Sequence, residues 1–382
     1  MQSSLARVHH VAFVFSYHGL HLQQLTGKSL ILIERSVHSH SETPSSILLI
    51  RLSSLGDVIL ATPVVRVLRA RYPNARIDVA VAREYAEVWK GNPYVNTVVI
   101  VDKSRSAFHT LRRSTLSGIA SRYDIVLDLQ NNLRSLVLRY RYGRKRFVVN
   151  SMRREKQALV SHTRDARALP HVVERYFNAA SSLDVRNDGV GLDLWLMNEA
   201  SEHLHHDEVV QTHKNRVVAI APGSKHFTKR WPPAAFAQCA ERLLHAGYEV
   251  VLIGSSFDRQ IFSEVLQRID STARQSVRSV IAESLDETLR IIDTASCVIA
   301  NDSSIVHIAA ARHVPVIDVY GSTVPAFGFT PYKSDHVIVE TDVECRPCTH
   351  FGRSECPKGH FRCMNDIDVN SVVSSAMRFL AS

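Results

Sequence analysis

Residues Ile47–Pro63 read ILLIRLSSLGDVILATP, and this stretch decides the predicted fold class. Its first four residues form an apolar run that suits a buried strand of a parallel sheet and is too short for a stable helix. Ser53–Gly56 supply turn residues, and from Val58 the apolar residues recur at helical spacing. A strand that feeds a helix through a small polar loop predicts an open α/β sheet with this loop at its carboxyl edge, where ligands bind.

Asp57 stands where that helix begins, and its carboxylate has two interpretations. As an N-terminal cap it would accept backbone N–H bonds, worth about 0.5–2 kcal/mol. As a chemical group it would face the ligand that the loop binds. The residues around it leave both interpretations open.

The chain has 382 residues, enough for two or three domains, and a formal net charge of +9. This charge suits nucleic acid, an anionic membrane surface or a phosphorylated substrate as a partner. No known nucleic-acid-binding motif accompanies the basic residues, so we expect no nucleic acid partner. No apolar run in the sequence approaches the ~20 residues of a transmembrane helix.

Residues 1–45 differ from the rest in their scattered histidines and serines. Their first apolar patch, Val11–Phe15, is shorter than the ~7–15 apolar residues of a signal-peptide core, and no small-residue cleavage site follows it. We therefore expect a poorly ordered extension, or the product of an upstream start codon, and no export.

Alternating strand and helix signals divide the remaining chain into two similar halves. The strands expected in the first domain, residues 46–190, are Ile47–Ile50, Arg76–Val81, Val95–Val101 and Tyr123–Leu129. Those expected in the second domain, residues 216–382, are Arg216–Ile220, Glu249–Ile253, Ser296–Ala300 and Pro315–Tyr320. With a basic helical connection over residues 104–122 and a linker over residues 191–215, the prediction is two Rossmann-like α/β domains that face each other across a cleft.

Strand ends in the second half carry small or hydroxylated residues, which let backbone N–H groups approach a ligand. The loop Gly223–Trp231 also carries Lys225 and Lys229 directly before a helix, and the amino ends of helices favour anions. Taken alone, this loop is also typical of an exposed basic surface. Several such loops along one edge predict a nucleotide-diphosphate site. The residues singled out at these strand ends are Ser224, Gly254, Ser303, Ser304, Gly321, Ser322 and Thr323.

Asp302 and His307 lie five residues apart across a strand-to-helix junction. His307 would either contact a phosphate or hold the loop as a hydrogen-bonded structural residue. The first strand is followed neither by a Walker lysine motif nor by a complete G-x-G-x-x-G, so ATP hydrolysis and nicotinamide chemistry are not supported.

Arginine and lysine are dense over Arg134–Lys156, just after the polar cluster Gln130–Asn132 that ends a predicted strand. Such a run is typical of a solvated face. It is also typical of an electropositive rim that meets an acidic substrate.

Four cysteines follow the spacing C-x2-C-x7-C-x6-C between Cys345 and Cys363, with Cys348 and Cys356 between them. Four thiols can hold one tetrahedral ion, but this spacing matches no standard zinc ribbon. Structural zinc or another metal, reduced thiols in a loop, and disulfides are therefore three alternatives.

Four motifs of the chain resemble, in order, the signatures of the bacterial lipopolysaccharide heptosyltransferases, the ADP-heptose transferases of glycosyltransferase family 9. They are RLSSLGDVILATP, APGSKHFTKRWPP, NDSSIVHIAAA and YGSTVPAFGFTPY. The similarity extends over Ser46–Tyr332, and the cysteine segment is also similar to one in many members. The resemblance implies a GT-B fold, with the acceptor on the amino-terminal domain and the nucleotide sugar on the carboxyl-terminal one.

The resemblance also implies roles for single residues. Asp57 falls on the aspartate of the family's glycine-aspartate motif, which implies the catalytic base, and Lys229 falls on its donor-site lysine. Asn301, Asp302, Ser303 and His307 match the family's Asn-Asp-Ser/Thr-Gly-x-x-His motif. Ser304 stands where the family usually has glycine, and a positive φ there would give serine a conformational cost. The residues expected to bind the acceptor are Ser53, Ser54, Gly56, Asn131 and Arg134.

The expected function is an inverting transfer of heptose from ADP-heptose to Kdo-lipid A or heptosyl-Kdo-lipid A. Lysine and helix ends would neutralise the leaving group, so no cofactor is required. The basic rim would meet the anionic acceptor and hold a cytoplasmic protein peripherally at the inner membrane leaflet. A GT-B enzyme that uses another nucleotide sugar on an anionic glycan, and a non-catalytic basic binding protein, are the alternatives.

Overall fold

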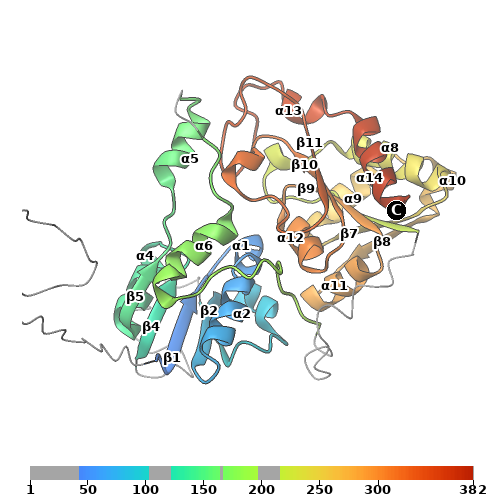
Figure 1. The fold of residues 1–382 in the computed structure, drawn as a ribbon. Coiled ribbons are helices and arrows are strands. Elements are labelled where there is room, and N and C mark those ends of the chain that lie inside the picture. The colour runs from blue at the N-terminus through green and yellow to red at the C-terminus, as the bar shows by residue number, and fades with distance from the viewer. Residues whose placement is uncertain (1–42, 103–121, 164–166, 197–215, 382) are drawn as a thin grey trace, which may run out of the picture. The chain divides into compact units, whose positions relative to one another are not determined.

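The structure of the protein, a computed structural model, describes residues 43–102, 122–163, 167–196 and 216–381. Most of the expected extension (residues 1–45), nearly all of the basic connection (104–122) and most of the linker (191–215) lie outside the described residues. The described residues belong to one compact unit, Thr43–Ser382, and form two parallel sheets (Figure 1).

Five strands of the described residues form the first sheet, in the order β3-β2-β1-β4-β5. They are β1 (Ser46–Ile50), β2 (Arg76–Ala82), β3 (Thr97–Val101), β4 (Tyr123–Asp128) and β5 (Gly143–Val148). Along the central strand β1, Ile47 and Leu49 pack into one apolar cluster and Leu48 and Ile50 into another. Both faces of the sheet are therefore covered, which is why β1 is apolar throughout.

The helices that follow these strands place polar residues at the carboxyl edge of the sheet. They are α1 (Leu55–Ile59), α2 (Thr62–Arg71), η1 (Arg83–Trp89), α4 (Leu133–Tyr142), α5 (Arg153–Val160), α6 (Val172–Ala180) and η2 (Ser181–Leu183). α6 has a strongly apolar face, and His171 caps its first turn by accepting a hydrogen bond from the Val173 N–H at 3.2 Å.

Six strands of the described residues form the second sheet, in the order β11-β10-β9-β6-β7-β8. They are β6 (Val217–Ala221), β7 (Glu249–Gly254), β8 (Val277–Ile281), β9 (Cys297–Asn301), β10 (Val316–Tyr320) and β11 (His336–Glu340). The helices are η3 (Phe227–Lys229), α8 (Pro233–His245), η4 (Ser256–Asp258), α9 (Arg259–Leu266), α10 (Ser271–Arg274), α11 (Leu285–Asp293), α12 (Ser304–Ala311), η5 (Pro325–Phe327), α13 (Arg362–Asn365) and α14 (Val369–Leu380). Two parallel α/β sheets of Rossmann type confirm the predicted fold class.

The eight predicted strands are all present, and three further strands were not predicted. These are β5, β8 and β11, and each forms an edge of its sheet. Edge strands have one open side and less apolar contact, so they lack the buried run that identifies a central strand. The sequence of β5 is GRKRFV, whose basic residues also keep an open edge from pairing with other chains.

Hydrogen bonds join the segment after β10 to the beginning of α6. The Leu169 N–H donates to the Ala326 carbonyl at 2.8 Å, and the Val172 N–H donates to the Gly328 carbonyl at 2.9 Å. A Cβ atom at Gly328 would lie 2.6 Å from the Pro170 carbonyl oxygen, so this crossing requires glycine. The two halves are thus in direct contact beside the carboxyl edge of the first sheet.

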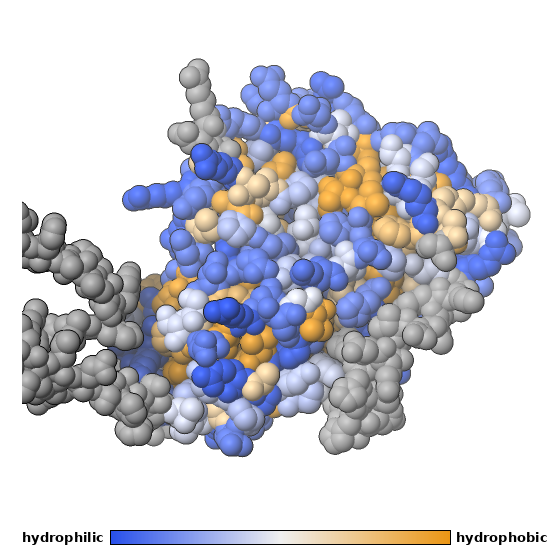
Figure 2. Space-filling model, viewed as in Figure 1, coloured by the Kyte–Doolittle hydropathy of each residue, from blue (hydrophilic) through white to orange (hydrophobic). Residues whose placement is uncertain are grey.

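Hydrophilic residues surround separate hydrophobic patches on the face drawn in Figure 2. Within the described residues, none of the helices combines the length and the apolar character needed to cross a bilayer.

Candidate active site

Asp57 lies in the first turn of α1, and both of its carboxylate oxygens have partners. Oδ2 accepts hydrogen bonds from the Ser54 backbone N–H at 3.1 Å and from the Ser54 hydroxyl at 2.7 Å. Oδ1 pairs with Nη2 of Arg51 at 2.6 Å. Ser54 is the N-cap residue, so the capping interpretation of Asp57 needs a correction: Asp57 is the third helical residue that reaches back to the cap.

Arg51 is a site residue that the sequence pattern did not reveal, because it reads as the end of an apolar strand. Its side chain is 11% exposed, and Nη1 donates to the Leu129 carbonyl at 2.5 Å. Its guanidinium also lies 5.5 Å from the centre of the Tyr176 ring. Burial alone would raise the pKa of Asp57, but the Arg51 charge and the hydrogen bonds from Ser54 outweigh burial and lower it. Asp57 is therefore ionised at neutral pH.

Gly56 and His307 bring α1 and α12 into contact. A Cβ atom at position 56 would lie 2.8 Å from Cδ2 of His307 and 3.7 Å from the Cα atom of Ser304. The helix that carries Asp57 and the helix that begins at Ser304 approach this closely because residue 56 has no side chain.

His307 is 4% exposed, and Nδ1 has no hydrogen-bond partner within the part of the chain that the structure describes. Burial first, and the charge of nearby His171 second, lower the pKa of His307 to about 4, so its ring is neutral at pH 7. The charges of Asp302, Asp57 and Lys229 also act on this ring. His307 thus lies between the predicted base and the predicted donor loops.

Lys229, Asp302 and Thr323 come together from the ends of three neighbouring strands of the second sheet. Nζ of Lys229 lies 2.7 Å from Oδ2 of Asp302. The hydroxyl of Thr323 donates to the same oxygen at 2.6 Å. The loops after β6, β9 and β10 therefore meet at one carboxylate, and the phosphate site expected at these loops stays a prediction.

Asn301, the last residue of β9, fixes the loop before Lys229. Its Oδ1 accepts the Trp231 N–H at 2.9 Å, and its Nδ2 donates to the Pro222 carbonyl at 2.8 Å. The side chain is fully buried, so these two hydrogen bonds are shielded from water. Asn301 consequently has a structural role.

Ser303 and Ser304 are half-buried at the start of α12, where Ser303 is the N-cap residue. The φ angle of Ser304 is not positive, because Ser304 is the first residue of the helix. The condition for a conformational cost of serine at this position is therefore not met. The first N–H groups of a helix such as α12 have no acceptor within the helix itself.

The other predicted donor residues lie in different environments. Ser224 is buried and its carbonyl accepts from Nε of Arg230 at 2.6 Å, whereas Lys225 is exposed. The Ser322 hydroxyl is buried and donates to the Thr228 hydroxyl at 2.9 Å. Ser224 and Ser322 therefore serve the loops through internal bonds.

Close packing leaves no room for a side chain at Gly254 or at Gly321. A Cβ atom at Gly254, or at Gly223 in the preceding loop, would lie within 3 Å of Asp258. A Cβ atom at Gly321 would lie 2.4 Å from Cε of Met364. Asp258, which the sequence pattern did not single out, accepts from the Ser255 N–H at 2.8 Å and so lies between two of the loops.

The predicted acceptor residues lie at the carboxyl edge of the first sheet. Gln130 accepts hydrogen bonds from the N–H groups of Leu52 and Ser53 at 2.9 and 3.1 Å, which fixes the loop before Asp57. Asn131 donates to the Val149 carbonyl at 3.0 Å and so holds the end of β5. Arg134 is half-buried in the first turn of α4.

The basic run Arg134–Lys156 divides into two environments. Residues 144–146 are exposed on the edge strand β5, where they form a solvated face. Lys156, on α5, is half-buried, and its ammonium lies 5.9 Å from the centre of the Phe329 ring. Arg175, on α6, lies 5.5 Å from the same ring and is 5% exposed.

Lys156 and Arg175 are close enough to Asp57 to interact with it electrostatically. Burial, reinforced by the Arg175 charge, lowers the pKa of Lys156 to about 8. Nε of Arg175 is buried with no hydrogen-bond partner among the described residues. A half-buried and a buried cation, Lys156 and Arg175, thus lie beside Asp57. The sequence pattern did not single out Arg175, because a single arginine in an amphipathic helix is ordinary.

The four cysteines of the segment Cys345–Cys363 are free thiols. Sγ of Cys345 lies 3.8 Å from Nε2 of His360. Among the described residues, no three histidine, cysteine or acidic side chains are grouped as metal ligands would be. The disulfide alternative is not realised, and a metal at this segment stays a prediction.

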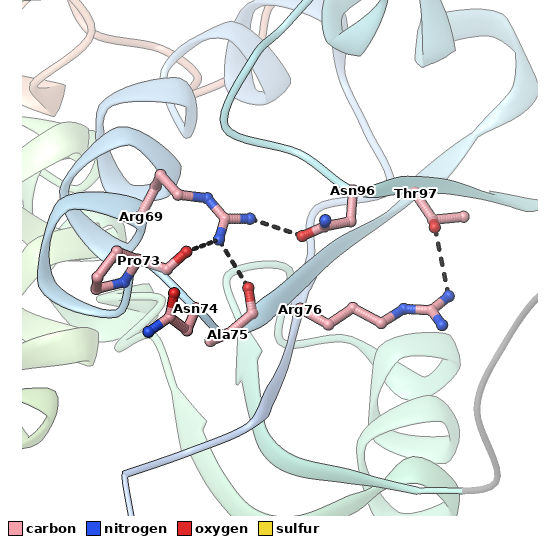
Figure 3. A pocket seen from close by; sticks show the side chains of 7 residues that line it. All are labelled: Arg69, Pro73, Asn74, Ala75, Arg76, Asn96 and Thr97. Atoms are coloured by element: carbon pink, nitrogen blue, oxygen red, sulfur yellow. Dashed lines mark hydrogen bonds between the residues drawn. The ribbon is translucent and has the colours of Figure 1, made fainter.

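A cavity of about 170 Å³ adjoins the site between η1 and α11. Leu55 and Ser255 line it, which connects it with the loop of Asp57 and with the end of β7. The Leu285 N–H donates to Oε2 of Glu87 at 2.9 Å, so the cavity lies where the two halves meet. A second cavity, of about 420 Å³, lies at the amino ends of β2 and β3, away from these loops (Figure 3). Arg69 lines this cavity and donates hydrogen bonds to the Ala75 carbonyl and to the Asn96 side chain, which stabilise the turn before β2.

The family model of glycosyltransferase family 9 (heptosyltransferase) matches residues 112–358. The chain belongs to this family. It is 28% identical over 297 residues to lipopolysaccharide heptosyltransferase 2 of Salmonella typhimurium, covering 74% of this chain and 84% of that protein. It is also 28% identical over 320 residues to lipopolysaccharide heptosyltransferase 1 of Pseudomonas aeruginosa, covering 79% and 85%.

Solved structures agree with the GT-B arrangement. A family 9 glycosyltransferase from Veillonella parvula superposes with a TM-score of 0.68 at 21% identity and covers 88% of this chain and 97% of that one. The heptosyltransferase II of E. coli gives a TM-score of 0.63 at 24% identity, covering 88% and 98%. The protein is therefore a glycosyltransferase with the two-domain fold of its family.

Proposed function

We propose that this glycosyltransferase moves a heptose from ADP-heptose to an anionic sugar of the lipopolysaccharide inner core. Its matched relatives are heptosyltransferases of lipopolysaccharide and lipooligosaccharide, and an E. coli heptosyltransferase has been solved with ADP. The observation that carries the proposal is the contact of Gly56 with His307, because it brings Asp57 beside the loops that converge on Lys229 and Asp302.

Asp57 acts as the general base in this proposal. It removes the proton from an acceptor hydroxyl while that oxygen bonds to the anomeric carbon of the donor, and the bond from this carbon to the diphosphate breaks on the opposite face. The product has inverted configuration, and ADP leaves. Arg51 keeps the carboxylate ionised at neutral pH, ready to accept the proton.

Lys229 and the beginning of α12 stabilise the leaving diphosphate. The ammonium of Lys229 exchanges part of its contact with Asp302 for a phosphate oxygen, and the N–H groups of Ser303 and Ser304 at the start of α12 donate to the same group. Thr323 keeps Asp302 in place during this exchange. Because these groups neutralise the charge, the reaction needs no metal ion.

Lys156 and Arg175 bind the anionic group of the acceptor. A carboxylate or phosphate placed between them would pair with two cations that form no salt bridge within the described residues, and would lie beside Asp57. We propose that the exposed basic residues of β5 form the surface for peripheral contact with the anionic inner leaflet. Tyr140 beside them is exposed, and the centre of its ring lies 4.5 Å from the guanidinium carbon of Arg146.

Mass spectrometry of the product tests this function. The protein is incubated with a defined truncated lipopolysaccharide acceptor and, in parallel, ADP-heptose, ADP-glucose or a UDP-N-acetylhexosamine. We expect a product heavier by one heptose with the first donor only. Transfer from another donor would favour the alternative GT-B enzyme, and no transfer together with no nucleotide-sugar binding would favour a binding protein.

A further inference from the structure

The cysteine segment, Cys345–Cys363, contacts two of the donor loops although none of its residues is part of the proposed chemistry. We propose that this segment is a brace that positions Lys229 and the loop Gly321–Thr323 for the donor diphosphate, and that Arg346 and Thr228 are its two positioning residues. The inference rests on the proposed function, because it assumes that these loops bind ADP-heptose.

Arg346 holds the loop after β10 through its guanidinium. Nε donates to the Gly321 carbonyl at 2.5 Å, and Nη2 donates to the Thr323 carbonyl at 3.0 Å. The remaining donors reach the Thr341 carbonyl at 2.6 Å and the Glu340 carboxylate at 2.7 Å. The side chain is 7% exposed, so water cannot replace these bonds. A planar group with donors in several directions is needed here, and lysine would not supply it.

Thr228 joins the segment to the loop that carries Lys229. Its N–H donates to the Arg353 carbonyl at 3.1 Å, and its hydroxyl accepts the Arg353 N–H at 2.8 Å. The same hydroxyl accepts from Ser322 at 2.9 Å, and the Thr228 carbonyl accepts the Ser322 N–H at 3.3 Å. Thr228 is 1% exposed and directly precedes Lys229 in the chain.

Side-chain packing reinforces the same junction. The rings of Phe227 and Phe361 stack with centroids 4.9 Å apart. Gly352 has a φ of +106°, and a Cβ atom there would lie 2.5 Å from Cβ of His226. The turn of the segment therefore lies directly on the residues before Lys229.

These contacts place the segment one step from the groups that meet the diphosphate. Lys229 and Thr323 both bind Oδ2 of Asp302, and the segment fixes the backbone on either side of this carboxylate, at Thr228 and at Thr323. If either attachment is removed, the distance between Lys229 and Thr323, the two residues that bind Asp302, is no longer fixed. The expected consequence is weaker binding of the diphosphate, since more freedom must then be lost when it binds.

Titration calorimetry with ADP on the full-length protein tests the brace. Thr228→Val keeps the shape of the side chain but removes the hydroxyl, and Arg346→Ala removes the guanidinium. We expect ADP to bind about tenfold more weakly to each, the effect of roughly one lost buried hydrogen bond, with unchanged stoichiometry. Thr228→Ser, which restores the hydroxyl, should recover wild-type affinity. Arg362→Ala, at a surface arginine of the same segment that pairs with Asp366, is the control and should bind as wild type.

Stoichiometry separates positioning from folding. A variant that is merely less folded would give fewer binding sites of normal affinity, whereas a loosened loop gives the normal number of weaker sites. Normal affinity in both Thr228→Val and Arg346→Ala, or reduced stoichiometry with normal affinity, would overturn the brace while leaving the proposed function intact. If the wild-type protein itself did not bind ADP, the proposed function and the brace would both fall.

Discussion

Gly56 of the first half touches the imidazole of His307 in the second half. A Cβ atom at position 56 would lie 2.8 Å from Cδ2 of this ring, and the ring is almost fully buried. The contact fixes the separation between the carboxylate of Asp57, one residue after Gly56, and the beginning of α12. The helix that carries the proposed base and the helix that begins at the proposed leaving-group site follow strands of different sheets, and they touch at this contact.

The first prediction concerns Gly56→Ala. The added methyl group must displace His307 or separate the two helices, which costs about 1–3 kcal/mol in a packed interior. We expect kcat to fall at least tenfold with little change in ADP affinity, because the base is displaced while the donor loops are not. Ser276→Ala, at an exposed residue between α10 and β8, is the control. Equal turnover by Gly56→Ala and the wild type would contradict the contact.

The second prediction concerns Lys229→Met. Losing a charged hydrogen-bond donor to phosphate should weaken ADP binding by about 10- to 100-fold, measured by calorimetry. Lys358→Met, at an exposed lysine of the cysteine segment, should bind ADP normally. Unchanged affinity in Lys229→Met would remove this lysine from the donor site.

The third prediction is a pH profile for Arg51→Met. The reaction requires ionised Asp57, so kcat/KM falls as the pH falls through the pKa of Asp57. Arg51 lowers that pKa, while burial raises it. Without Arg51 the pKa rises, so we expect the acid limb of kcat/KM to move to higher pH, whereas the wild type stays level between about pH 5 and 7. Superimposable acid limbs in the two proteins would show that Arg51 does not tune the base.

The fourth prediction separates stability from acceptor binding at Lys156. Its pKa is lowered from 10.5 to about 8, so the unfolded chain binds more protons than the folded protein between these two values. The contribution of Lys156 to stability is therefore unfavourable below about pH 8 and improves as the pH rises to about 10.5.

Lys156→Met removes this unfavourable charge, so the thermal midpoint at pH 7 should not fall. The KM for an anionic acceptor should rise several-fold because one of its two cations is lost. Lys358→Met, at an exposed lysine of the cysteine segment, should change neither quantity. A lower midpoint with an unchanged acceptor KM would make Lys156 a structural residue.

The central strands and the loops at their carboxyl ends could be predicted from the sequence because each has a local pattern. β1 and β6 are buried on both faces and therefore read as continuous apolar runs, and β4 and β9 contain shorter runs of the same kind. The edge strands β5, β8 and β11 have no such pattern, since half of their surface meets solvent or charge. Their positions depend on neighbours that are distant in the chain.

The candidate site could be predicted only in part for the same reason. Asp57, Lys229 and Asp302 stand at strand ends, where the local pattern identifies them. Arg51 and Arg175 gain their importance from tertiary contacts with Asp57 and Phe329, which the spacing of residues does not encode. The partners of buried polar residues such as Thr228 are likewise set by the fold.

The central claim is that Asp57 is the base and does not bind the donor. The most direct measurement is single-turnover transfer by Asp57→Asn from ADP-heptose to a defined acceptor, with ADP affinity measured in parallel. Asp366→Asn, which alters a surface carboxylate that pairs with Arg362, is the matched control. We predict a rate lowered by about 10²–10⁴-fold with ADP affinity within about twofold of the wild type. A near-normal transfer rate in Asp57→Asn would contradict the account.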